Sequence, residues 1–278
     1  MALEDPVPLA AHDALERRYR SAAPERILWN DTIARLLDHR TVRGFRPDPL
    51  PVELIPTLVA AAQSAATSSN LQLWSVVAVE DEEKRKELAR LAGGQKHIEH
   101  APLILLFVAD LARTGLIADE AGAPSDGFDY LESFTVATVD AALAAQNAVI
   151  AAESLGLGTV YIGALRNHPE EVAKLVGLPP RAAVVFGLVL GWSDATRPAA
   201  VKPRLPQSVV LHRETYDLGG QSTAIAEYDR DARAFQEEQG QDPVGWRALV
   251  LARGASAAAL HGREKLKGAL HALGFDLK

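Results

Sequence analysis

The sequence predicts an α+β fold in which one mixed β-sheet is flanked by helices. Two observations support this class. Only a few segments have the apolar composition and the length of strands, and helical patterns separate them. In addition, two predicted helices precede the first strand and a helical tail follows the last, so the order is not a regular series of βαβ units. The predicted strands cover about residues 73–79, 103–109, 159–162 and 182–190.

The predicted helices surround these strands. Residues 1–25 are expected to form an N-terminal extension, helical in part around 11–20, and residues 26–278 to form the main domain. Gly115, Gly122, Pro124 and Gly127 make residues 111–127 look like an irregular surface excursion. The segment 130–155 is so rich in alanine that we expect a helix buried on most sides. Helices are predicted at about 26–38, 52–65, 80–92, 130–155, 169–176, 222–239, 244–260 and 263–273.

The composition excludes several classes of function. The chain has 278 residues, of which 48% are apolar and 23% charged, as in a globular protein with a large core. A net charge of −7 disfavours binding to nucleic acid or to an anionic membrane. Because there is no cysteine, there is no disulfide, thiolate nucleophile or cysteine-ligated metal. No apolar run has the length of a membrane span, and no signal peptide is evident, so we expect a cytoplasmic protein.

A basic loop follows the helix predicted at 26–38. Arg40 and Arg43 offer planar forks of donors, and Thr41 adds a hydroxyl, so the loop could bind a phosphate. Taken alone, the loop is better explained as a basic helix C-terminus that offsets the helix dipole. A second basic loop, Lys202–Pro206, is stiffened by prolines, and it too could be an ordinary solvated loop.

The sequence lacks the common motifs of nucleotide-binding, metal and nucleophile sites. There is no dinucleotide-binding G-x-G-x-x-G after a strand, no Walker loop, no H-E-x-x-H and no G-x-S-x-G elbow. His97 and His100 are three residues apart, but Glu99 is the only acid beside them, so we do not expect a metal site. No catalytic nucleophile is expected either. Cofactor chemistry is therefore the better hypothesis for an enzyme.

Six motifs in order along the chain resemble the oxygen-insensitive nitroreductase and flavin reductase family. Each is weak alone, but their order and spacing are specific, and they span about residues 30–230. Their order and spacing resemble the NADPH-preferring subgroup. The motifs are His39–Arg43, Ala66–Gln72, Gly93–His97, Ala145–Gly158, Tyr161–Asn167 and Lys202–Pro206.

The resemblance implies a nitroreductase-like fold, with a mixed and mainly antiparallel sheet, in an intertwined homodimer. It also implies non-covalent FMN at the subunit interface and NADPH or NADH as the electron donor. The acceptor would be a small aromatic molecule, such as a nitroaromatic, a quinone or free flavin. It would be reduced by hydride transfer with ping-pong kinetics, without a metal and without a catalytic side chain.

The resemblance also assigns residues to the phosphate of FMN. His39, Arg40 and Thr41 match the phosphate-contacting loop of the family. Arg204, in the second basic loop, resembles its distant partner for the same phosphate. Thr41 replaces the usual serine and keeps the hydroxyl.

A second set of residues is similar to the family's contacts with the flavin ring. Arg43 and Lys202 resemble the pair at the pyrimidine edge, where cations would stabilise the negative charge of the reduced ring. Ala164 stands where the family more often has a second glycine. The residues expected at the ribityl chain and the ring are Thr67, Ser69, Gln95, Tyr161, Ile162, Gly163 and Ala164.

One departure from the family concerns the electron donor. NADPH-preferring relatives have an arginine-rich loop that can hold the 2′-phosphate, but here residues 237–245 carry three acids and no base before Arg247. Since acids repel a phosphate dianion, we expect weaker NADPH preference and use of NADH or another donor. Two alternatives remain open from the sequence: an FMN-binding storage or sensing module without turnover, and a helical scaffold without flavin.

Overall fold

The computed structural model describes residues 9–278. They divide into two compact units. Unit 1 contains the described residues up to Arg40 together with Ala199–Ala259, and unit 2 contains Thr41–Pro198 together with Leu260–Lys278. The boundary between Arg40 and Thr41 falls inside the first basic loop.

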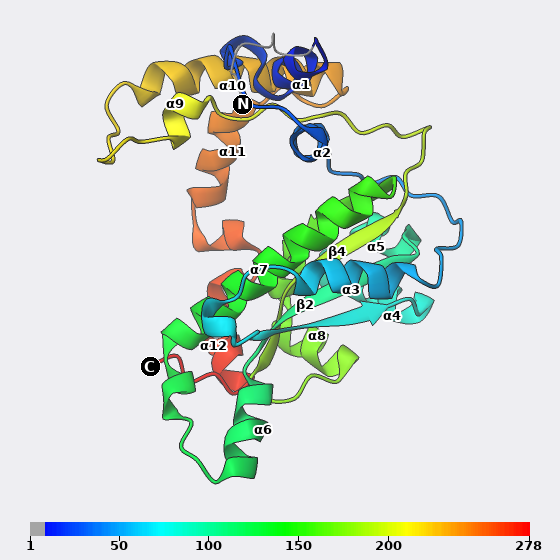
Figure 1. Cartoon of the computed structure of the whole chain (residues 1–278), viewed down its shortest axis with the longest axis vertical. Coiled ribbons are helices and arrows are strands. Elements are labelled where there is room, and N and C mark those ends of the chain that lie inside the picture. The colour runs from blue at the N-terminus through cyan, green and yellow to red at the C-terminus, as the bar shows by residue number, and fades with distance from the viewer. Residues whose placement is uncertain (1–8) are drawn as a thin grey trace. The chain divides into compact units, whose positions relative to one another are not determined.

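Unit 2 is built on a four-stranded sheet in the order β1-β2-β4-β3, and every pairing between these strands is antiparallel (Figure 1). The α+β class and the mainly antiparallel sheet are thus confirmed. Among the described residues, parallel pairing is limited to an isolated bridge between Thr41 and Thr159. The apolar run of β2 is buried along most of its length, as a central strand requires. The strands are β1 Trp74–Val79, β2 Leu103–Asp110, β3 Leu157–Ile162 and β4 Ala182–Trp192.

The long alanine-rich helix α7, Leu131–Ser154, packs along this sheet and against α3, Leu54–Gln63 (Figure 1). Its length and composition alone would allow it to cross a membrane. Its small side chains instead let the backbone lie close to the sheet, in the position of a core helix. The alanines buried on this face are Ala137, Ala141, Ala144, Ala145, Ala148 and Ala152.

The other helices of unit 2 are short. The α-helices are α4 Glu82–Leu91, α5 Lys96–His100, α6 Ala112–Ala121, α8 Pro169–Val176 and α12 Leu266–Ala272. The 3-10 helices are η2 Ser68–Asn70, η3 Asp126–Asp129, η4 Gly163–Asn167 and η6 Arg263–Lys265.

Unit 1 is helical in its described residues. An ion pair between Arg20 and Glu238, at 2.6 Å, joins the N-terminal segment to α10. A hydrogen bond from Ser21 to Asp231, at 2.8 Å, adds to it. The helices are α1 Leu9–Tyr19, η1 Arg20–Ala22, α2 Asp31–Asp38, α9 Gln207–Val210, α10 Gln221–Glu238 and α11 Gly245–Gly254, with η5 Ala257–Leu260 at the unit's end.

Several predicted boundaries were wrong. Residues 111–127 are not irregular: α6 forms there and ends at Gly122, whose φ of 60° suits a left-handed helix cap. The helix predicted from residue 26 begins at Asp31, because the Asn30 side chain accepts the N–H of Ile33 and caps it. The short helices α5 and α9 were not predicted, and the helix predicted at 244–260 ends at Gly254.

Candidate functional site

A buried arginine of unit 1 holds the two predicted phosphate-binding segments together. Arg18, on α1, is 5% exposed, and its guanidinium donates to the carbonyl oxygen of Lys202 at 2.7 Å. It also donates to the carbonyl oxygens of Leu37 and His39, at 2.8 and 2.6 Å. The N–H of Arg204 in turn donates to the Arg18 carbonyl at 2.8 Å. Because a guanidinium presents its donors in one rigid fork, Arg18 fixes the end of α2 beside the second basic loop.

The side chains of Arg40 and Arg204 have different partners. Arg40 is exposed and forms an ion pair with Asp38 at 3.1 Å. Exposed ion pairs contribute only about 0–1 kcal/mol, so a phosphate can compete for Arg40. Arg204 donates to the carbonyl oxygens of Lys202 and Pro203, at 3.5 and 3.4 Å, and has no carboxylate partner among residues 9–278. Both guanidiniums can therefore bind an anion.

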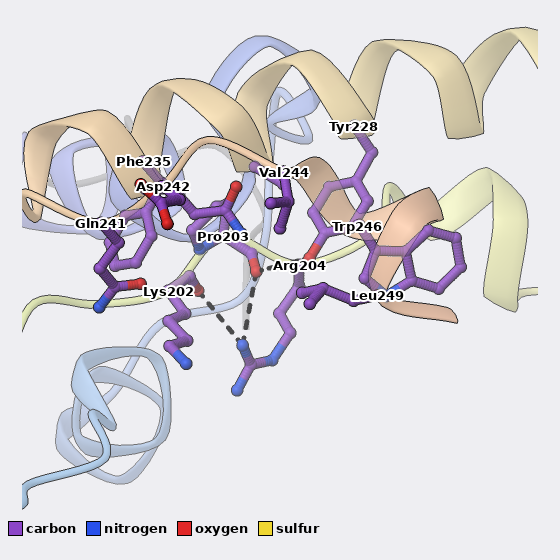
Figure 2. Close-up of a pocket in the computed structure, with 12 residues that line it drawn as sticks. Lys202, Pro203, Arg204, Tyr228, Phe235, Gln241, Asp242, Val244, Trp246 and Leu249 are labelled. Atoms are coloured by element: carbon purple, nitrogen blue, oxygen red, sulfur yellow. Dashed lines mark hydrogen bonds between the residues drawn. The ribbon is translucent and has the colours of Figure 1, made fainter. Parts of the chain in front are cut away.

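A hollow of about 380 Å³ lies in unit 1 next to Lys202 and Arg204, whose side chains extend to the same side of it (Figure 2). Its wall includes Tyr228 and Trp246, which pack edge to face with ring centroids 5.6 Å apart. Tyr228 is oriented by a hydrogen bond from its hydroxyl to the Pro203 carbonyl, at 3.2 Å. Aromatic walls beside two cations can accommodate a planar ring and its phosphate.

A carboxylate occupies the N-terminus of α11, in the predicted donor-binding stretch. Asp229 accepts the N–H of Arg247 at 2.7 Å and the side chain of Arg233 at 3.1 Å, and the Arg247 N–H is the main reason why its pKa is lowered. A Cβ on Gly245 would lie 2.6 Å from Asp229, and the φ of Gly245 is 78°, so glycine is required there. The Asp229 carboxylate thus caps the first turn of α11.

In unit 2, the segment that follows Arg40 lies against β3. Thr41 bridges Thr159, and the N–H of Val42 donates to the Thr159 carbonyl at 2.9 Å. The Val42 side chain is buried, whereas Arg43 is exposed. This close approach requires Gly158, since a Cβ there would lie 2.7 Å from the Val42 side chain. The predicted ring-edge arginine is thus carried on an extended segment attached to the sheet.

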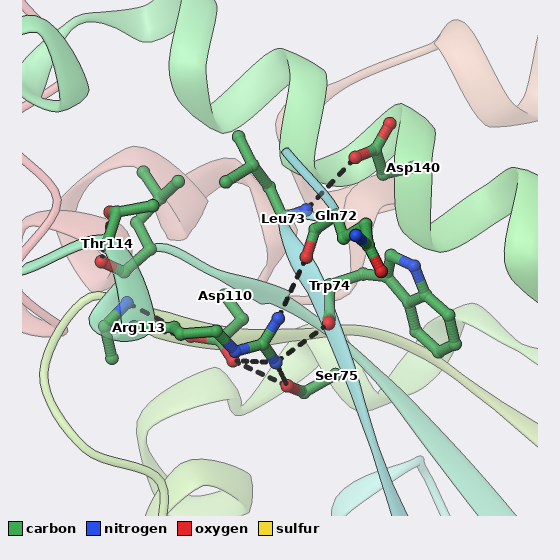
Figure 3. Close-up of polar contacts among 10 residues, drawn as sticks. Gln72, Leu73, Trp74, Ser75, Asp110, Arg113, Thr114 and Asp140 are labelled. Carbon is green, nitrogen blue, oxygen red and sulfur yellow. Dashed lines mark hydrogen bonds and ion pairs between the residues drawn. The ribbon is translucent and has the colours of Figure 1, made fainter. Parts of the chain in front are cut away.

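The loop that contains Thr67 and Ser69 is held by a carboxylate from α7. Asp140 is 2% exposed and accepts the N–H of Ser68 at 3.2 Å and that of Leu73 at 3.1 Å; Figure 3 shows the second bond. Between these anchors the backbone is strained, because Ser69, Asn70 and Gln72 have φ values of 50°, 55° and 53°. Each such non-glycine conformation costs roughly 1–3 kcal/mol and persists only where surrounding contacts hold it, as the contacts to Asp140 do here.

A second anchor holds the far end of this loop (Figure 3). Arg113, in the first turn of α6, donates to the carbonyl oxygen of Gln72 at 3.0 Å and to the Ser75 hydroxyl at 2.6 Å. It also forms an ion pair with Asp110 at 3.2 Å. The segment 111–127, predicted as a surface excursion, therefore helps to hold the edge strand β1 and the loop 67–72 through Arg113.

The predicted ring-facing turn follows β3. Tyr161 is 39% exposed, and its ring packs edge-on against Phe186 with centroids 5.2 Å apart. Its hydroxyl donates to Gln146 at 3.4 Å. Tyr161, Gln146 and Gly163 line an open hollow of about 410 Å³. The Ile162 side chain is buried at 1% exposure, so only its backbone could face a ligand.

Gly163 and Ala164 begin the 3-10 helix η4, and the first N–H groups of a helix have no partner within it. Arg166 lies under this turn and donates to the carbonyl of Val185. A Cβ on Gly163 would lie 3.2 Å from the Arg166 guanidinium, which leaves little room for a larger residue. The turn can therefore offer backbone donors to a ligand at close range.

Gln95 and His97 lie at the start of α5. The Gln95 amide donates to the Ala92 carbonyl at 2.8 Å, which leaves its side-chain oxygen as an acceptor. The His97 Nε2 atom is buried without a hydrogen-bond partner in the described structure. Burial, with a smaller effect of the Arg43 charge, lowers the pKa of His97, so its imidazole is neutral at neutral pH.

Two family models match the sequence. The model of the nitroreductase family matches residues 36–192, and that of the nitroreductase family C-terminal domain matches residues 202–278. The chain belongs to the nitroreductase family. The predicted family is thereby confirmed, and the second match covers α9 to α12, beyond the last predicted motif.

Individual members of the nitroreductase family match over most of the chain. An FMN reductase (NADPH) from Bacillus subtilis strain 168 is 43% identical over 227 residues, which cover 80% of this chain and 90% of that protein. The solved structure of B. megaterium NfrA2 has a TM-score of 0.84 at 37% identity and covers 90% of this chain and 100% of its own. The NADPH:FMN oxidoreductase from Vibrio harveyi, solved in complex with NAD+, has a TM-score of 0.78 at 36% identity, with coverage of 90% and 100%.

Within each unit, the fold brings some of the predicted residues of this family member together. In unit 1, Arg18 places His39 beside Lys202 and Arg204. In unit 2, Thr41 forms an isolated bridge with Thr159 of β3, and Thr159 is two residues before Tyr161.

The supporting residues Arg18 and Asp140 were missed by sequence reasoning. A signal for each was present. Arg18 continues the helical spacing of the buried residues Ala11, Ala14 and Leu15, and Asp140 interrupts the buried alanine face of α7. A charged residue on a buried helix face needs partners, so such a position can indicate a supporting role.

Proposed function

We propose that the chain is an FMN-dependent NAD(P)H oxidoreductase that reduces nitroaromatics, quinones or free flavin. The observation that carries the proposal is the clamp formed by Arg18, which holds the backbone of His39 near that of Lys202 and Arg204, residues that we propose bind an anion. The printed names of the relatives support the same activity, since they include an FMN reductase and an NADPH:FMN oxidoreductase.

FMN fits the chemistry of these residues. His39, Arg40, Thr41 and Arg204 offer cations and a hydroxyl for a phosphate dianion. Of these, Arg204 has no carboxylate partner among the described residues. The remaining contacts, proposed for the ribityl chain and the ring, are Thr67, Ser69, Gln95, Tyr161, Ile162, Gly163 and Ala164.

When bound, FMN would supply the redox chemistry, by accepting hydride from a nicotinamide and passing two electrons to the acceptor. The protein then needs only to hold the ring and stabilise its negative charge, and the family resemblance proposes Arg43 and Lys202 for this second role. No side chain acts as a nucleophile. Because donor and acceptor use one pocket in turn, steady-state kinetics are expected to be ping-pong.

The site is proposed to be complete in a cytoplasmic homodimer. Large apolar side chains are exposed on α7, including Leu131, Val139 and Leu143, which are 54%, 50% and 44% exposed. An exposed apolar helix face of this kind is typical of a subunit interface. A second copy of the chain is the proposed partner.

NADH is the proposed physiological donor. The stretch 237–245 carries Glu237, Glu238 and Asp242, and Asp242 lines the hollow next to Lys202 and Arg204. The first turn of α11 is already capped by Asp229. Both features oppose a 2′-phosphate. The ratio of kcat/KM for NADH over NADPH tests this: a value above one supports it, and a clear preference for NADPH contradicts it.

The visible spectrum of the purified chain, followed by steady-state kinetics, tests the activity. A yellow protein whose double-reciprocal plots are parallel for NADH and a quinone supports the enzyme. A yellow protein without turnover would favour the storage or sensing module, an alternative that the acidic stretch 237–245 favours. A colourless protein that ignores added FMN would contradict both.

A further inference from the structure

A second cavity in unit 2 is not used by the proposed reaction. Its volume is about 340 Å³, within the range of roughly 300–1,000 Å³ that is typical of small-molecule sites. Its walls are apolar and come from α7, β4 and α12, with Phe134, Val184 and Leu270 as examples. Phe186 and Arg166 line both this cavity and the open hollow beside Tyr161.

The residues that line this cavity in the described structure carry one charge, that of Arg166. Its guanidinium donates to the Val185 carbonyl and has no acidic partner among residues 9–278. Burial, and to a lesser extent the charge of Arg263, lowers the pKa of Arg166. A partly buried cation without a counter-charge is unfavourable, so an anion that enters the cavity would be stabilised.

A hydroxyl in the same cavity also has no partner. The Thr138 Oγ1 atom is buried and makes no hydrogen bond within the described structure. A hydroxyl can donate to a carboxylate oxygen, as a guanidinium can. The cavity therefore combines an apolar interior with an unpartnered hydroxyl and a guanidinium that has no acidic partner among the described residues.

We propose that this cavity binds a small amphipathic carboxylate. Its apolar body would lie against Phe134, Phe186 and Leu270, and its carboxylate would accept hydrogen bonds from Arg166 and Thr138. An aromatic monocarboxylate has the matching size and chemistry. A dianion or a polyol does not, since the cavity offers one cation and largely apolar walls.

Fluorine NMR of the flavin-loaded full-length protein tests this proposal with 4-fluorobenzoate as the probe. The neutral isostere 4-fluorobenzamide is the matched ligand control. Saturable binding of the benzoate, at least tenfold tighter than that of the benzamide, is expected, because hydrogen bonds to a charged group are the stronger ones. Equal binding of both probes, or no binding of the benzoate, would overturn the proposal.

Two variants locate the site. Arg166→Gln is expected to weaken benzoate binding by about tenfold or more, and Thr138→Val by a smaller factor. Thr135→Val is the matched control, because the Thr135 hydroxyl is exposed on the same helix and bonded to the Leu131 carbonyl at 2.9 Å. Unchanged binding in both Thr138→Val and Arg166→Gln would place the benzoate elsewhere and overturn the proposal. The test measures equilibrium binding, so it can fail while flavin reduction succeeds.

Discussion

Arg18 contacts three backbone carbonyls and so decides where the two basic segments of unit 1 lie. A lysine cannot reach three acceptors in the same way, because it has a point charge in place of a planar fork. Arg18→Lys is therefore expected to weaken FMN binding by roughly tenfold to a hundredfold. Fluorescence titration of the flavin-free protein with FMN measures this.

The neighbouring Arg17 provides the control for that experiment. It is exposed on the same helix, so Arg17→Lys should leave FMN affinity unchanged. Equal affinity in Arg18→Lys and the wild type would show that the clamp does not position the phosphate site.

Arg40 and Arg43 are proposed to have separate tasks within one loop. Among residues 9–278, Arg40 forms an ion pair with Asp38 at the surface and is available to a phosphate, so Arg40→Ala should lower FMN affinity about tenfold or more. Arg43 is exposed on the segment attached to β3, so Arg43→Ala should mainly slow the reduction of flavin that is still bound. Stopped-flow reduction and FMN titration of each variant separate the two effects. Loss of FMN affinity alone in both variants would refute the division.

His97 is expected to make stability depend on pH. Because burial lowers its pKa in the folded state, the unfolded chain binds more protons between the folded pKa and the ordinary value of 6.5. Stability should therefore rise with pH through this window, and this contribution is lost as the pH falls from 6.5 to the folded pKa. In His97→Asn the urea midpoint should change less between pH 5 and pH 7 than in the wild type. An equal or steeper change in the variant would contradict this assignment.

At the scale of elements, the attachment of the first basic loop to β3 depends on Gly158. A Cβ there would lie 2.6–2.7 Å from Ser193 and Val42, closer than any real contact. Gly158→Ala should therefore displace the segment 41–43, cost roughly 1–3 kcal/mol of stability and weaken FMN binding. Denaturant unfolding and FMN titration measure the two effects.

Gly115, in the middle of α6, is the matched control. Its nearest potential contact is 3.9 Å away, so Gly115→Ala should stabilise the protein by about 0.5–1 kcal/mol. If Gly158→Ala also stabilised the protein, the close approach of segment 41–43 to β3 would not require glycine at position 158.

Helices and strands with a continuous apolar pattern could be predicted from the sequence, whereas features positioned by single contacts could not. The strands and α7 could be predicted because their apolar patterns are continuous. In contrast, α6 was missed because its glycines were taken as loop signals, although Gly122 only ends the helix. The anchoring of the loop 67–72 by Asp140 depends on a contact across 67 residues, which no local pattern contains.

At the scale of the whole molecule, the site residues proposed from the family resemblance occur in both compact units. His39, Arg40, Lys202 and Arg204 belong to unit 1, and Thr41, Arg43 and the other proposed contacts belong to unit 2. Residue types and motif order were enough to predict the family, which the match over residues 36–192 confirms. The supports within each unit, Arg18 and Asp140, became visible only in the structure.

The central claim is that this chain binds FMN and that a nicotinamide donor reduces it. Anaerobic titration of the yellow, FMN-loaded protein with NADH tests this most directly. The account predicts that the visible flavin absorbance is bleached stoichiometrically and returns when a quinone is added. An absorbance that stays unchanged with both NADH and NADPH would contradict it.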